Sequence, residues 1–309
     1  MLSFAHPSSA SALFQGACAL VLLGLGAGCS EIDFAEQDLA LHYQEEADRI
    51  ELSVDTRGLF PTSSDWGESQ ATVVTKSKER VEAMAAGARY LYLVTFPFIL
   101  DLDREQPEDD EWLTREQITR AWGLFQDSVS VPSAKAFLDG MGEVALTQQV
   151  EIKNASACVA AVNEIITAGV LHELKGTTEK PGEVYGSDAS RKNLRAFADA
   201  GREWVSLDKD ALVVRVPMTP QDLALALKEL VAERRSAEDS SEEASWSERR
   251  GGAASQALLG NLQDLEVKDG VVTLRFPADD TGRIRWKFQM PRHPDAQKLV
   301  AAFDAEELK

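Results

Sequence analysis

Alternating apolar and polar residues early in the chain predict two paired strands. Apolar side chains occupy every second position in residues 39–43 and again in 50–54, with a polar segment that includes Glu45 and Asp48 between them. Side chains of a strand point alternately to its two faces, so each run has one apolar face. Two such runs around a polar turn predict a β-hairpin.

Further strands are predicted along the chain. Residues 90–100 read YLYLVTFPFIL. This nearly continuous apolar sequence predicts a buried central strand that ends at Pro97. Residues 272–276 and 284–290 alternate on either side of a turn at 279–282, and this pattern predicts a second hairpin. Two more strands are predicted, at residues 144–152 and 212–216.

Apolar residues at helical spacing predict amphipathic helices between these strands. Thr114 and Gln117 form a capping box at the start of one helix, Asn154 or Ser156 caps another, and Thr219 precedes a proline at the start of a third. The predicted helices cover residues 81–88, 114–125, 132–138, 154–168, 188–201, 219–233 and 294–308. Hairpins that alternate with such helices predict the α+β class, with mixed or antiparallel sheets and amphipathic helices packed on one face.

The segment Ala12–Ser30, ALFQGACALVLLGLGAGCS, carries no charged residue. Its apolar part is shorter than the roughly 20 residues that a transmembrane helix needs. It fits the hydrophobic region of a secretory signal, with small residues at 26–28 as a cleavage site. Because Cys29 follows directly, the segment resembles the lipobox of bacterial lipoproteins, although Gly26 stands where leucine or valine is usual.

The resemblance implies cleavage before Cys29 and a diacylglycerol on its sulfur, which would anchor the chain to a membrane. Each buried methylene contributes about 0.8 kcal/mol, so two or three acyl chains hold a protein in the bilayer almost permanently. Ser30, and not aspartate, follows the cysteine, which in such lipoproteins favours the outer membrane. The alternatives are an ordinary signal peptide cut at another position and a buried apolar helix.

These patterns predict the organisation of the chain. A signal peptide covers residues 1–28 and a lipid-anchored tether covers 29–37. One α+β lobe covers 38–175, and a second covers 185–309 after a polar, glycine-rich loop. Residues 236–254, SAEDSSEEASWSERRGGAA, lack apolar periodicity and predict a mobile insertion in the second lobe.

Composition narrows the classes of function. The formal net charge of −19 argues against binding to nucleic acid or to anionic lipid. Cys158 lies on the apolar face of a predicted helix, where a buried thiol behaves as a small hydrophobic residue. The sequence has no Walker loop, no nucleophile elbow and no cysteine pair at zinc spacing, so no cofactor is expected.

Arg283, Arg285 and Lys287 lie on one face of the predicted strand 284–290. In so acidic a chain they are candidates for binding an anionic partner, together with Trp246 of the predicted insertion. The alternative is a solvent-exposed face that pairs with the chain's own carboxylates.

Residues 101–111, DLDREQPEDDE, are rich in carboxylates, and Asp101, Asp103 and Glu105 are weak candidates for a calcium site. An EF-hand loop that starts at Asp101 would need glycine at its sixth position and glutamate at its twelfth, where Gln106 and Trp112 stand. The alternative is a solvated acidic loop.

Two classes of function remain. The first is a non-enzymatic binding or scaffolding lipoprotein of the cell envelope, with a protein partner. The second is a carboxylate-dependent hydrolase that acts on an envelope polymer and needs a cleft with two carboxyl groups, one of raised pKa. Carboxylates are so frequent in this sequence that no catalytic residue can be assigned.

Overall fold

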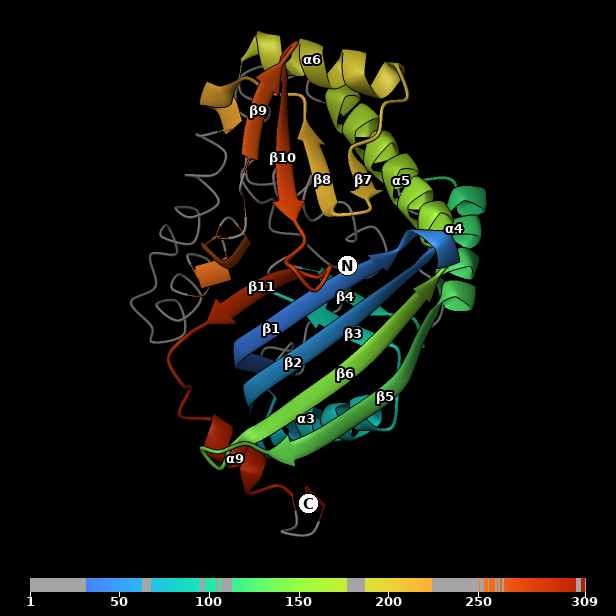
Figure 1. Cartoon of the computed structure of the whole chain (residues 1–309). Helices are drawn as coiled ribbons and strands as arrows, with labels where there is room; N and C mark the ends of the chain where they lie inside the picture. The colour runs from blue at the N-terminus through green and yellow to red at the C-terminus, as the bar shows by residue number, and fades with distance from the viewer. Residues whose placement is uncertain are drawn as a thin grey trace.

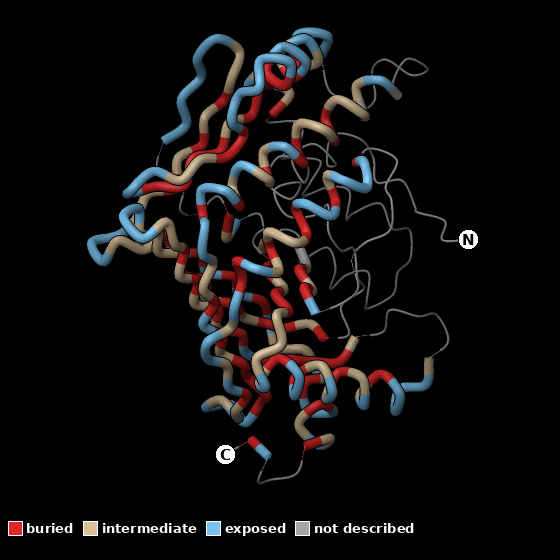
Figure 2. The backbone as a smooth tube through the Cα atoms, turned by 90° about the vertical axis from the view of Figure 1, so that its right-hand side faces the viewer, coloured by how far each residue is buried: buried red, intermediate tan, exposed pale blue. Residues whose placement is uncertain are grey.

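The protein is described by a computed structural model, and the three sheets formed by its described residues are all antiparallel (Figure 1). Buried segments gather between the layers, and exposed segments lie on the outer surfaces (Figure 2). The predicted α+β class, with helices packed against one face of the sheet, is confirmed. The structure describes residues 32–62, 68–94, 98–103, 106, 113–176, 187–223, 250, 253–254, 256–258, 260, 262, 264–303 and 307–308.

The largest sheet, sheet A, has five strands in the order β11-β1-β2-β6-β5. In β2, Ile50, Leu52 and Val54 are buried, whereas the residues between them are partly exposed. This alternation gives sheet A one apolar face and one polar face, as is usual for antiparallel sheets. Its strands are β1 (Ile32–Gln44), β2 (Arg49–Pro61), β5 (Val129–Leu138), β6 (Val144–Lys153) and β11 (Ile284–Gln289).

The tether predicted for residues 29–37 is wrong from Ile32 onward, because β1 begins there and pairs with β2 along its whole length. Phe34 is only 2% exposed and the side chain of Gln37 is fully buried. The two buried positions are three residues apart, so the period of two is broken between them. The sequence pattern therefore gave no indication of the first six of the 13 residues of β1.

A second layer covers the apolar face of sheet A. It contains α3 (Gln70–Ala85) and the two-stranded sheet of β3 (Tyr90–Leu93) and β4 (Phe98–Asp101), which lie behind sheet A in Figure 1. The single central strand predicted for 90–100 is therefore wrong, because the chain turns back between two short strands. Two buried glutamines fasten β3 to sheet A: Gln37 Nε2 donates to the Tyr92 carbonyl (2.8 Å), and Gln148 Nε2 donates to that of Tyr90 (3.2 Å).

Sheet C has the strand order β7-β8-β10-β9. It comprises β7 (Val205–Asp208), β8 (Ala211–Val216), β9 (Asp264–Lys268) and β10 (Val271–Pro277). The sheet packs with α5 (Ala155–Gly176) and α6 (Asp188–Asp199). Asn163 of α5 joins the two parts, because its Oδ1 accepts from the backbone N–H groups of Trp204 and Val205 (2.8 and 2.9 Å) and its Nδ2 donates to the Val205 carbonyl (2.8 Å).

The hairpin predicted from 272–276 and 284–290 is wrong in its pairing. Both strands exist, as β10 and β11, but β10 pairs with β8 and β9 whereas β11 pairs with β1. Alternation of apolar and polar residues indicates that a strand has one buried face. It does not indicate which strand pairs with it. The true hairpin signal is Asp269-Gly270, a two-residue turn in which both φ angles are positive, and it joins β9 to β10.

Two predicted helices also differ from the structure. Residues 132–138 form the end of β5, where Pro132 lies at a shift of register on an edge strand and needs no ladder hydrogen bond. The last helix, predicted for 294–308, is α9 (Ala296–Val300). The capping box of Thr114 and Gln117 is confirmed at the start of α4 (Arg115–Ser128).

The cap of α5 comes from a distant residue and not from the side chains of Asn154 or Ser156. Asp48, in the turn between β1 and β2, accepts hydrogen bonds from the backbone N–H and the hydroxyl of Ser156 (2.8 and 2.7 Å). Within the described residues, α5 is the one helix that is long and apolar enough to cross a membrane. Its buried positions, which include Cys158 and Ile166, pack in the main core.

The two predicted lobes, 38–175 and 185–309, share structure. Sheet A combines strands from both, since β11 pairs with β1. The main core also draws on both, with Leu39 and Trp286 in one cluster of buried side chains. Of the insertion predicted for 236–254, the described residues 250, 253 and 254 are packed against the body, and Arg250 is only 6% exposed. The prediction of mobility is therefore wrong for these three positions.

Candidate functional site

The polar face of sheet A has no covering layer among the described helices and strands. Figure 1 looks onto it, with α3, β3 and β4 on the far side. Side chains at every second position of five adjacent strands share this face, which we call the open face. Its residues include Arg285 and Lys287 of β11, Asp38 and His42 of β1, Glu51, Ser53 and Asp55 of β2, and Thr147, Gln149 and Glu151 of β6.

Two pairs of like charges stand directly opposite each other on the open face. Glu51 is the register partner of Glu151, and Arg49 neutralises both, at 3.0 Å from Glu51 and 3.6 Å from Glu151. Asp38 is the register partner of Asp55. Directly opposed like charges destabilise a sheet, so the Asp38–Asp55 pair favours a cation nearby, and Lys287 of β11 lies opposite Asp38 on its other side.

The predicted basic stripe lies at the edge of this same face. Arg285 Nε binds Asp279 Oδ2 at 2.6 Å, and Lys287 is the register partner of Asp38. Hydrogen bonds from Thr281 and Arg285 hold the pKa of the Asp279 carboxyl far below its usual range. Arg283 uses its backbone N–H to donate to the same carboxylate (3.2 Å). These contacts favour the alternative in which the chain's own carboxylates neutralise the positive charge of the basic stripe.

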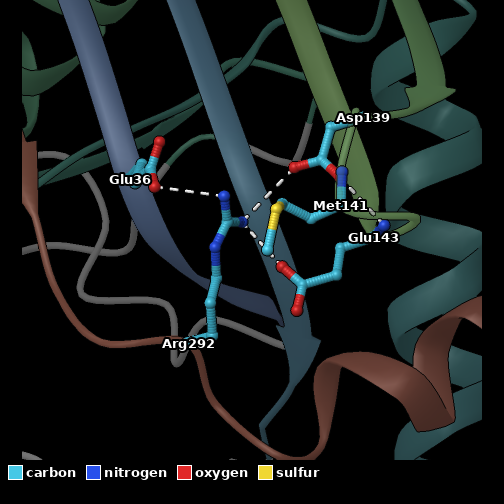
Figure 3. A network of polar contacts seen from close by, with 5 residues as sticks. All are labelled: Glu36, Asp139, Met141, Glu143 and Arg292. Carbon is cyan, nitrogen blue, oxygen red and sulfur yellow. Dashed lines mark hydrogen bonds and ion pairs between the residues drawn. The ribbon is translucent and has the colours of Figure 1, made fainter.

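A cluster around Arg292 closes one end of the open face (Figure 3). The guanidinium lies between Glu36 on one side and Asp139 and Glu143 on the other, at 3.1, 3.4 and 2.6 Å. Asp139 also accepts from the backbone N–H groups of Met141 (2.8 Å) and Glu143 (3.0 Å), which shapes the turn between β5 and β6. The cluster therefore fastens the segment after β11 to β1 and to this turn.

Gly58 is required for this approach. Its φ is +63°, and a Cβ at that position would lie 2.5 Å from Nη1 of Arg292. The arginine thus packs directly on the backbone of β2. Three carboxylates surround the one guanidinium of Arg292, so their negative charge is balanced within the cluster. The cluster therefore has a structural role, because it holds three segments of the chain together.

The predicted cation loop does not assemble as a metal site in the described residues. Arg80 binds Asp101 at 3.2 Å, and Arg89 binds Asp103 at 2.7 Å through its side chain and again through its backbone N–H. Glu105 lies outside the described residues. Across the described part of the chain, no group of three or more His, Cys, Asp or Glu side chains could hold a metal ion.

The other two predicted site residues, Cys29 and Trp246, lie outside the described residues. Cys158 is buried, and burial, with Asp48 nearby, raises the pKa of its thiol against a hydrogen bond to Ser128. A thiol of raised pKa is a poor nucleophile at neutral pH. This agrees with the interpretation of Cys158 as a core residue.

The titration of the carboxyl groups bears on acid–base chemistry. The pKa values of the Asp103, Asp222 and Asp279 carboxyl groups are clearly shifted, and each is lowered. A general acid at neutral pH needs a raised pKa. None of these three carboxyl groups is therefore prepared to donate a proton at neutral pH.

Sequence reasoning missed the arginines that organise the structure. Arg250 donates to the Phe34 carbonyl (2.8 Å), pairs with Asp33 and lies over the rings of Phe34 and Phe288 (4.9 and 5.0 Å). Asp33 and Phe34 are more than 200 residues away, and Arg250 lies within the low-complexity segment 236–254, so no local pattern indicated it. Comparison with known proteins found no family model, no curated protein and no solved structure that matches this chain.

Proposed function

We propose that this chain is an exported lipoprotein, anchored to the cell envelope through Cys29, whose body binds a protein partner on the open face of sheet A. The leader supports the anchor, because an uncharged apolar segment ends in small residues directly before Cys29. The acidic body supports a protein partner with a cationic surface, since a net charge of −19 repels anionic polymers.

The Asp38–Asp55 pair is the observation that carries the binding proposal. Two carboxylates face each other across β1 and β2, and although Lys287 of β11 is the register partner of Asp38, neither carboxylate forms an ion pair with a described residue within 4.0 Å. Opposite charges at such positions stabilise a sheet, and at the other like-charged pair Arg49 lies within ion-pair distance of both Glu51 and Glu151. A lysine or arginine of a partner would remove the repulsion and gain charge-assisted hydrogen bonds.

The alternative is a carboxylate-dependent hydrolase of an envelope polymer. It requires a proton donor, and the pKa values of the Asp103, Asp222 and Asp279 carboxyl groups are lowered. The Arg292 cluster brings two carboxylates together, but the guanidinium lies between them and Glu36. These observations favour binding over hydrolysis.

Site-specific photo-crosslinking in cells tests the binding proposal. A photoreactive residue at Gln149, which is exposed on the open face on β6, beside β2, should give a defined adduct with one partner. The matched control is the same residue at Arg195, which is exposed on α6. Asp38→Asn combined with Asp55→Asn should lower the yield of the Gln149 adduct at least several-fold while leaving the circular dichroism spectrum unchanged.

Two results would contradict the binding proposal. The first is the absence of any adduct from Gln149, or the same adducts from Gln149 and Arg195. The second is an adduct whose yield does not change when Asp38 and Asp55 are substituted. The partner would then contact the open face without interacting with these two carboxylates.

A further inference from the structure

The edge strand β9 of sheet C has an uncovered apolar side. Within the described residues it pairs with β10 alone, and all five of its residues are exposed. Leu265 and Val267 are 53% and 46% exposed. Large apolar side chains on an open strand edge promote pairing with another strand, so such edges are usually charged, short or covered.

The side of the sheet on which these two residues lie is set by register. Leu265 is opposite Leu274, and Val267 is opposite Val272. Both partners on β10 are almost fully buried in the main core. Leu265 and Val267 therefore lie on the same side of sheet C as the buried core residues of β10. At the edge strand β9 this side is exposed.

The turn between β9 and β10 sets the direction of the backbone groups. Asp269 and Gly270 form a two-residue turn, and the flanking pair Lys268–Val271 exchanges hydrogen bonds within the hairpin. Alternation along the strand then directs the N–H and C=O groups of Leu265 and Val267 away from β10, toward the open edge. Asn193 of α6 donates to the Gly270 carbonyl (3.1 Å), which holds this turn in place.

The sequence of β9, Asp264-Leu265-Glu266-Val267-Lys268, is complementary to itself in antiparallel register about its central residue. In that register Leu265 lies opposite Val267 of a second copy, and Asp264 lies opposite its Lys268. The first pair matches the residues whose backbone groups point outward, so it exchanges both hydrogen bonds. The second pair places opposite charges together.

We propose that β9 is a homodimerisation edge, which joins sheet C of two copies of this chain into one continuous antiparallel sheet around a two-fold axis. A two-fold axis uses the same surface on both subunits, as this register requires. The interface is small beside the roughly 1,200 Å² that stable complexes bury. The two Glu266 side chains also face each other, so the dimer is weak and depends on concentration.

Disulfide trapping of the full chain in mild detergent tests the register. Glu266→Cys places two thiols opposite each other in a pair without mutual hydrogen bonds, where Cα atoms are about 4.5 Å apart. Oxidation should convert it to a covalent dimer. Asp264→Cys and Lys268→Cys, each alone, should stay monomeric, because their equivalents lie at opposite ends of the paired strands. The double variant Asp264→Cys/Lys268→Cys should dimerise.

Wild type controls for the native cysteines and should give no dimer under the same oxidation. Charge exchange gives a second readout by light scattering. Lys268→Glu should reduce the dimer fraction at least several-fold, and Asp264→Lys in the same chain should restore it, since the opposed charges are again complementary.

Several outcomes would overturn the proposal. One is a monomeric Glu266→Cys variant. Another is equal trapping of the Glu266→Cys and Asp264→Cys variants, which would indicate random collision. A third is a disulfide from position 266 to a different protein, which would assign the edge to a foreign strand. None of these outcomes bears on the anchor or on the open face of sheet A.

Discussion

At the scale of single residues, the contacts of Arg250 explain how a segment of low complexity is fixed to the body. Its guanidinium donates to the Phe34 carbonyl and to the Tyr92 hydroxyl (2.8 and 3.2 Å) and lies over the Phe288 ring. Burial and the nearby Asp33 raise the pKa of Tyr92 to about 12, so this phenol stays neutral. Leaving a buried charge without its partner costs free energy. The buried Asp33 carboxylate and the Arg250 guanidinium therefore stabilise each other.

We expect Arg250→Met to lower the free energy of unfolding by about 3 kcal/mol, because it leaves the Asp33 carboxylate without its buried counter-charge. Arg120→Met is the matched control, since both side chains of the Arg120–Glu164 pair are more than half exposed. It should cost less than about 1 kcal/mol. Urea denaturation measures both values, and equal losses would contradict the account of Arg250.

Asp222 illustrates how hydroxyl groups shift a carboxyl pKa. Burial acts to raise it, but hydrogen bonds to Oδ2 from Ser187 (2.5 Å), Ser190 (2.6 Å) and Thr219 (2.8 Å) outweigh burial, and the pKa is lowered. A lowered pKa in the folded state stabilises the protein above the pKa of the unfolded chain. That contribution is lost as pH falls through the folded pKa.

Asp222→Asn should therefore be less stable than wild type at pH 7, by about 1 kcal/mol, because an amide accepts these bonds without charge. The difference should shrink below about pH 4, where the aspartate of the unfolded wild-type chain becomes protonated. Chemical denaturation across this range measures the difference. A gap that stays constant with pH would contradict the assignment of the shift to Asp222.

The sequence predicted residues with local roles better than residues with distant partners. Thr114 and Gln117 are three residues apart, and their capping box is confirmed. Arg250 and Arg292 contact residues more than 140 positions away, and Asp48 caps a helix that begins over 100 residues later. Such contacts arise only when the fold brings the elements together.

At the scale of elements, the Arg292 guanidinium approaches the backbone of β2 closely at Gly58. Gly58 and Gly142 both have positive φ (+63° and +74°), but only Gly58 has an atom near the position of a Cβ. Substituting each glycine in turn therefore distinguishes two contributions to the free energy of unfolding. One is the left-handed backbone, which both sites share, and the other is displacement of the Arg292 guanidinium, which occurs only at Gly58. A residue with a Cβ pays about 1–2 kcal/mol for the left-handed conformation at either site.

We expect Gly142→Ala to lose about 1 kcal/mol and Gly58→Ala to lose at least twice as much, since its methyl group also breaks the Arg292 cluster. Thermal or urea unfolding of the two variants provides the comparison. Equal losses would mean that the cluster contributes nothing to stability.

Strands were easier to predict than their partners. The alternation in 39–43, 50–54, 272–276 and 284–290 does correspond to strands. The pairing of β10 with β11 failed because the turn at 279–282 carries the chain from one sheet to the next. The Asp269-Gly270 turn was the better guide, since its geometry fixes the register of the two strands that it joins.

At the scale of the whole molecule, sheet A is covered on one face and open on the other, and sheet C extends it through a shared core. The α+β class followed from local periodicity alone. The shared core did not, because β1 and β11 pair although about 240 residues separate them in the sequence. The compartment and the anchor depend on a segment outside the described residues, and they stay predictions.

The open face and the anchor belong to one proposal, because an export signal places the body among envelope proteins. The measurement that tests it most directly is the intact mass and membrane partition of wild type against Cys29→Ala, both expressed in a bacterium. Wild type should lose residues 1–28, gain the mass of a diacylglycerol and pellet with membranes, and the variant should do none of these. Wild type that is soluble, without acyl mass and with its leader retained would contradict the account.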